Sequence, residues 1–104
     1  MTNHIFTNIH VLDCSGADPF DAEVEIKGNR IHKISTTPIA RMDQTVIDGQ
    51  GCTLMPGLVE AHAHASFTDI NVFEDIGDTP PEEHTLLTAH FARVLFDAGF
   101  TSLF

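Results

Sequence analysis

Two histidines separated by one residue, His62 and His64, are the residues of this sequence whose type and spacing best suit chemistry. They end an apolar stretch that we predict to be a buried strand over residues 58–64. Residues two apart in a strand point to the same face, so both imidazoles can converge on one cation. Neutral imidazole suits zinc and other borderline transition metals. The pair therefore predicts a metal site, and the competing interpretation is two surface histidines without a metal.

The same alternation places Glu60 on the face of the two histidines, deeper in the predicted strand. The opposite face carries small apolar side chains, namely Val59, Ala61 and Ala63. A carboxylate inside a fold needs a partner. Glu60 therefore either orients a metal ligand or forms a structural salt bridge, and the sequence leaves both open.

The elements that would position this strand follow it directly. Residues 65–79 read as an irregular loop, and an apolar-weighted stripe from Leu86 to Ala98 then predicts a helix. We expect Thr79 as its N-cap, Pro80 at its first position and Glu82 completing a capping box.

Gly99 is the expected helix stop, and residues 100–104 open another strand. His90 falls on the packing stripe and is expected to be half-buried. Strand, loop, helix and strand form one βα unit of a parallel α/β fold. The strand's carboxyl end, where His62 and His64 lie, is where such folds gather their chemistry. Because the sequence stops in mid-strand, we expect it to be a fragment of a larger fold.

The first half of the sequence is different in pattern. Short strands are predicted over residues 4–13, 22–27, 30–35 and 45–48, and Gly28-Asn29 predicts a tight hairpin between the second and third. In the first strand, Ile5, Ile9 and Val11 are expected on one face and Phe6 on the other. We therefore divide the chain into a β-rich module, residues 1–55, and a βα module, residues 56–104.

Composition narrows the function classes. The 104 residues are 42% apolar and carry a formal net charge of −10. Nucleic-acid binding, which needs Lys and Arg for the phosphates, is disfavoured. Cys14 and Cys52 lack metal-type spacing and are expected to be buried free thiols, with a disulfide between them as the alternative. No signal peptide or membrane-spanning stretch is visible, so membrane partners are not expected and a cytoplasmic location is the default.

Several stretches resemble one family. The segment PGLVEAHAH at residues 56–64 is similar to the Pro-Gly-Leu…His-x-His signature of the amidohydrolase superfamily, and the preceding VIDGQGCTLMPGL resembles its usual approach. AHAHASF and the ending AGFTSLF look most similar to the branch that contains imidazolonepropionase-like enzymes and Xaa-Pro dipeptidases.

The resemblance implies a (β/α)8 barrel, here only begun, preceded by a β-sandwich that residues from the C-terminus complete. It implies one or two divalent metals, usually zinc, with His62 and His64 as the first ligands and the others on later strands. The implied activity is hydrolysis of an amide or cyclic amide C–N bond by metal-activated water. The expected substrate is a small molecule or a dipeptide-like compound. The chain is expected to pack against the remainder of the same polypeptide, and the protein is expected to form a homo-oligomer.

Two other functions compete with this enzyme. A non-catalytic relative could keep the fold as an assembly module, although it would have no reason to retain both His62 and His64. A stand-alone β-rich binding domain is disfavoured, because the apolar strand of the βα unit needs neighbours on both sides.

Overall fold

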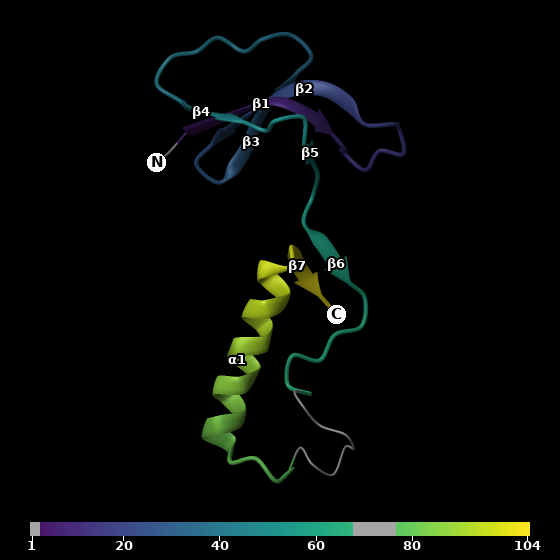
Figure 1. Ribbon diagram of the computed structural model, residues 1–104, viewed down its shortest axis with the longest axis vertical. Coiled ribbons are helices and arrows are strands. Elements are labelled where there is room, and N and C mark those ends of the chain that lie inside the picture. Colours follow the sequence, from purple (N-terminus) through teal and green to yellow (C-terminus); the bar gives the residue numbers. More distant parts are fainter. Residues whose placement is uncertain (1–2, 68–76) are drawn as a thin grey trace. The chain divides into compact units, whose positions relative to one another are not determined.

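The computed structural model describes residues 3–67 and 77–104, which form two compact units (Figure 1). The first unit extends to Pro56 and the second begins at Gly57. Residues 68–76, most of the predicted loop, lie outside the described part of the chain.

The first unit is a five-stranded mixed sheet. Its strands are β1 (Asn3–Val11), β2 (Phe20–Lys27), β3 (Arg30–Ser35), β4 (Thr45–Asp48) and β5 (Thr53–Leu54). β1, β2 and β3 are antiparallel neighbours, whereas β4 and then β5 pair in parallel with the free side of β1. The predicted hairpin is confirmed: Gly28, with φ 61°, supplies the left-handed residue between β2 and β3.

A β-bulge in β1 decides which residues reach the core. Phe6 pairs with Val24, but Ile9 pairs with Ala22, so β1 has one residue more than β2 between these pairs. The expected split of faces was therefore wrong, because the extra residue moves Ile9 onto the face of Phe6. Asn8 lies in the bulge at φ 51°, a left-handed conformation that Asn tolerates better than most residues.

The core of this unit follows from that register. Its buried cluster consists of Ile9, Val11, Ala22 and Val24, with Phe6, Phe20, Ile26 and Leu54 packed against it. The same face continues into an open apolar groove, where Ile31 is 65% exposed and Ile34 43% exposed. A second layer over this groove, as in a sandwich, remains a prediction.

The second unit is a βαβ unit, with β6 (Leu58–Glu60), α1 (Pro81–Asp97) and β7 (Phe100–Leu103). β6 and β7 are parallel neighbours (Figure 1). The described residues thus form an α/β fold with one βα unit and the strand that follows it, and a closed barrel stays a prediction. Leu58 and Val59 were expected to be buried but are 40% and 59% exposed, because β7 is the only neighbour of β6 among the described residues.

The helix begins and ends almost where predicted, but its N-terminus is built differently. Pro80 occupies the N-cap and Pro81 follows at the first helical position, with no side-chain cap. The capping box from Thr79 was therefore wrong; the fixed φ of proline starts the helix instead. At the other end, Gly99 has φ 99°, as expected for the residue after a helix.

The helix face that packs is also shifted from the predicted stripe. The half-buried positions are His84, Leu87, Thr88, Phe91, Ala92 and Leu95. Leu86, Val94 and His90 are exposed, so the expectation of a half-buried His90 was wrong. The physical reason is that β7 is the strand that packs against α1 among the described residues, and this single strand covers only a narrow band of the helix surface.

Cys14 and Cys52 are free thiols, as expected, but both are exposed rather than buried. Cys14 lies in the turn after β1 with φ 60°, and Cys52 precedes the two-residue strand β5, so neither side chain reaches the core. No helix in the described part of the chain is long and apolar enough to cross a bilayer.

Candidate metal-binding site

His62 and His64 do not lie within a strand, because β6 ends at Glu60. The predicted strand over 58–64 was therefore too long. The chain nevertheless stays beside β7: the amide of Phe104 donates to the Glu60 carbonyl at 3.0 Å, and the amide of Ala63 donates to the Phe104 carbonyl at 2.8 Å. These two main-chain hydrogen bonds hold the histidine segment at the carboxyl end of both strands.

The two imidazoles converge. Nε2 of His62 and Nε2 of His64 are 3.0 Å apart, and the rings meet edge to face at an interplanar angle of 79°. Two nitrogens that each bind one tetrahedral zinc at about 2.0–2.1 Å lie about 3.3 Å apart. Both side chains are exposed. The pair therefore fits two ligands of one borderline metal ion.

Glu60 lies behind this pair and contacts the main chain rather than an imidazole. Its Oε1 accepts the backbone N–H of His62 at 3.3 Å. Among the described residues no Lys or Arg forms an ion pair with Glu60, so the alternative of a structural salt bridge finds no partner there. The carboxylate can steady the backbone from which His62 projects.

Phe67 contacts the second histidine of the pair. Its ring stacks on the His64 imidazole with centroids 4.1 Å apart and an interplanar angle of 12°. The amide of Phe67 also donates to the His64 carbonyl at 3.0 Å, which closes a tight turn between the two residues. The His64 imidazole thus lies between two rings: it meets the His62 ring edge to face and stacks on the Phe67 ring.

His84, to which the sequence assigned no role, also reaches this segment. Its Nε2 lies 2.7 Å from the carbonyl oxygen of Ser66, two residues after His64. Nothing in the sequence pattern could have paired residues 66 and 84, because they are 18 residues apart and no local periodicity relates them. His90, on the same helix, instead meets the ring of Phe91 edge to face.

A complete metal centre needs further ligands. Within residues 3–67 and 77–104, no group of three or more His, Cys, Asp or Glu residues could hold a metal ion. That the remaining ligands come from elsewhere in the polypeptide stays a prediction.

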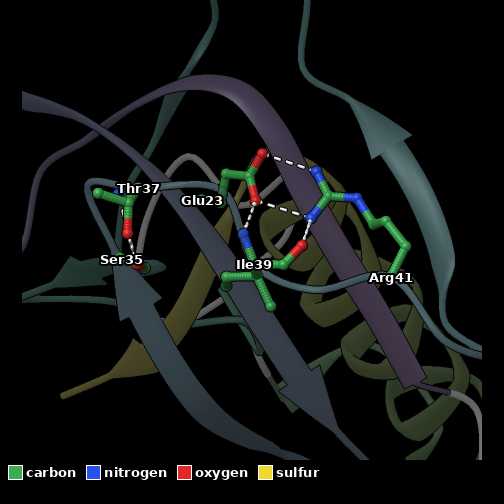
Figure 2. Close-up of polar contacts among 5 residues, drawn as sticks. All are labelled: Glu23, Ser35, Thr37, Ile39 and Arg41. Atoms are coloured by element: carbon green, nitrogen blue, oxygen red, sulfur yellow. Dashed lines mark hydrogen bonds and ion pairs between the residues drawn. The ribbon is translucent and has the colours of Figure 1, made fainter.

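A separate polar cluster lies in the first unit and has a structural role. Figure 2 shows that both terminal nitrogens of Arg41 donate hydrogen bonds to the Glu23 carboxylate. Nη2 donates to Oε1 at 2.6 Å and Nη1 donates to Oε2 at 2.8 Å. Arg41 Nη1 also donates to the carbonyl of Ile39, whose amide donates to Glu23 at 2.7 Å. Hydrogen bonds from Arg41, and then from the Ile39 amide, lower the pKa of Glu23 against the opposing effect of desolvation.

Comparison with known proteins decides the family. No protein-family model matches the chain. Over 82 residues it is 38% identical to the 5'-deoxyadenosine deaminase of Methanothermobacter thermautotrophicus, a match that covers 79% of this chain and 18% of that protein. It is 35% identical over 72 residues to the dihydroorotase of Syntrophotalea carbinolica, covering 69% and 17% of the two chains.

A solved amidohydrolase structure superposes on 98% of the chain with a TM-score of 0.88 and 30% identity, and the match covers 25% of that structure. The chain belongs to the amidohydrolase superfamily. A prolidase structure also matches 98% of this amidohydrolase chain and 25% of its own, with a TM-score of 0.88; at 24% identity it supports the fold alone. The chain thus spans about a fifth of the length of its curated amidohydrolase-superfamily relatives, and its two units correspond to part of such proteins.

Proposed function

We propose that the protein is a metal-dependent hydrolase of amide or cyclic amide C–N bonds, in which His62 and His64 bind a divalent metal, preferably zinc. The observation that carries the proposal is the 3.0 Å separation of their Nε2 atoms at the carboxyl end of β6. The enzymes that resemble this chain include deaminases and a dihydroorotase by name. One or two ions would fit the proposal, with the other ligands supplied by the rest of the polypeptide.

Each residue of the site has a distinct role in this proposal. When bound, the metal polarises a carbonyl oxygen and activates water. His62 and His64 bind the ion through Nε2, the nitrogen that each turns toward the other. Glu60 accepts the amide of His62 and so orients the segment without touching the ion. The base and most of the substrate pocket would come from elsewhere in the polypeptide.

The substrate class has two candidates. Amide, cyclic amide or dipeptide-like compounds follow from the resemblance of AHAHASF and AGFTSLF to the imidazolonepropionase-like and Xaa-Pro dipeptidase branch. Deamination of an aminopurine nucleoside is the second, favoured by the 38% identity to 5'-deoxyadenosine deaminase. Both reactions use water to break a C–N bond. Hydrolysis of an amide forms a carboxylate and frees the nitrogen group, and in a cyclic amide both stay in one ring-opened product; deamination replaces the amino group with oxygen and releases ammonia.

The non-catalytic assembly module is not favoured. Two exposed histidines with converging nitrogens serve no packing purpose, and the matching curated proteins carry enzyme names.

The test uses the full-length protein, stripped of metal and reloaded with Zn²⁺. It is assayed against Xaa-Pro dipeptides, cyclic amides such as dihydropyrimidines, and 5'-deoxyadenosine, beside free Zn²⁺. We expect zinc-dependent turnover of one class and its loss in His62→Ala and His64→Ala. Absence of bound metal in the wild-type protein, or wild-type turnover in both variants, would overturn the proposal.

A further inference from the structure

The orientation of His64 depends on a chain of contacts that reaches the helix. Its ring is exposed to solvent, so its side-chain torsions are not fixed by burial. It is held by His62, through the 3.0 Å contact between the Nε2 atoms and the edge-to-face ring packing, and by the ring of Phe67, which stacks on it with centroids 4.1 Å apart. The position of Phe67 therefore helps to decide where His64 Nε2 points.

The turn that carries Phe67 is itself fixed from outside. The amide of Phe67 donates back to the His64 carbonyl at 3.0 Å, and the Ser66 carbonyl lies within this turn. That carbonyl lies 2.7 Å from Nε2 of His84, in the first turns of α1. A carbonyl oxygen has no proton to give, so Nε2 of His84 must be the donor.

His84 is well anchored for this task. Its own amide donates to the Pro80 carbonyl at 2.9 Å, and its side chain is half-buried against the second unit. A contact from a rigid helix to a turn is more exact than one between two loops.

We infer that His84 is a positioning residue for the metal-binding pair: through the Ser66 carbonyl it fixes the turn that stacks Phe67 on His64. This inference rests on the proposed function, because it concerns how the His62–His64 pair receives its metal. His84 does not touch the ion. It lowers the conformational entropy that His64 loses on binding, because the imidazole is already ordered.

The test measures Zn²⁺ affinity of the full-length protein by competition with a chelator, together with its melting temperature. His84→Leu removes the donor at similar size, and His84→Gln keeps an N–H donor. His90→Leu is the matched control, an exposed histidine of the same helix. We expect zinc binding about 10- to 100-fold weaker in His84→Leu. His84→Gln should recover most of this loss, and His90→Leu should bind zinc like the wild type.

If His84→Leu does not fold, Phe67→Leu tests the inference instead. It removes the ring that stacks on His64 and leaves the hydrogen bond between His84 and the Ser66 carbonyl in place. It should weaken zinc binding in the same direction. In either folded variant, wild-type zinc affinity would overturn the inference, and so would equal weakening in His84→Leu and His84→Gln.

A further variant, His64→Ala, separates the two proposals. If it loses zinc while His84→Leu and Phe67→Leu keep wild-type affinity, the metal site stands and the positioning role fails. If His64→Ala itself binds zinc like the wild type, the proposed function fails first. Loss of zinc affinity in His64→Ala and the graded loss in His84→Leu together support both.

Discussion

The Nε2 atoms of His62 and His64 lie 3.0 Å apart although β6 ends two residues before His62. Their convergence therefore does not come from the alternation of a strand. The segment is instead held by the main-chain hydrogen bonds that Glu60 and Ala63 form with Phe104, and by the turn closed by Phe67. The same pair of histidines in a free loop would have no common direction.

Replacing either histidine by Ala should lower the metal content of the full-length protein and abolish hydrolysis, while circular dichroism stays unchanged. Both side chains are exposed, so their loss removes no core packing. Metal analysis by mass spectrometry on His62→Ala and His64→Ala checks this, with His90→Ala as the control. Full metal occupancy in both variants would show that the histidines are not ligands.

Gly57→Ala should destabilise the protein by about 1–3 kcal/mol, the usual cost of overpacking. A Cβ at Gly57 would lie 2.8 Å from Cβ of Thr101 and closer still to the rest of that side chain. Gly77→Ala is the matched control, since nothing lies within 4 Å of its added Cβ. Thermal unfolding should give a lower Tm for the first variant only, and equal Tm values would contradict the crowding.

Arg41→Met should destabilise the first unit at pH 7, because it removes the hydrogen bonds that the Arg41 guanidinium donates to Glu23. The Arg41 side chain is 40% exposed, so solvent screening keeps this effect small. The pKa of Glu23 is lowered in the folded state, so this stabilisation is present above the unfolded value of about 4.3. It is lost as the pH falls through the lower, folded value. Urea unfolding should therefore show a gap between wild type and variant that narrows below about pH 4.

The control for that experiment is Arg93→Met, which breaks an exposed ion pair to Asp97 within α1. Such pairs contribute about 0.5 kcal/mol or less. If Arg93→Met costs as much as Arg41→Met, or if the Arg41→Met gap is the same at pH 7 and pH 3.5, the Glu23 cluster does not stabilise the sheet as described.

The 104 residues alone, loaded with zinc, should be catalytically inactive. Catalytic zinc normally has three protein ligands, and the described residues hold no group of three that could bind a metal. An assay of this chain against the same substrates, beside free Zn²⁺, checks the expectation. Turnover well above that of the free ion would show that these 104 residues contain a complete set of metal ligands, and would contradict the prediction.

Local sequence signals predicted the parts of the fold that depend on local physics. The Gly28-Asn29 hairpin is present, β4 spans Thr45–Asp48 as expected, and Gly99 follows the helix in a left-handed conformation. Each rests on a backbone conformation or an alternation that a few neighbouring residues impose.

Burial was predicted less well, because it depends on what packs from outside the segment. The bulge at Asn8 places the β1 residues that follow it on the opposite face from the one expected. Four residues that were expected to be buried or half-buried are exposed, namely Cys14, Cys52, Val59 and His90. A single sequence does not show where a bulge will form in a strand, or how much of a helix surface the neighbouring strand will cover.

For the site, the residue types and spacing of His62 and His64 nominated them only together with the apolar lead-in, the division of side chains between two faces and the loop, helix and strand that follow; spacing alone left two surface histidines as an alternative. The sequence also determined the order of strand, helix and strand, through hydrophobic periodicity and Gly99. Only the tertiary structure decided that the two Nε2 atoms meet, that Phe67 stacks on His64 and that His84 holds Ser66. The first two contacts depend on ring orientations that residue types alone do not set, and the third joins residues 18 apart in the sequence, which no local pattern brings together.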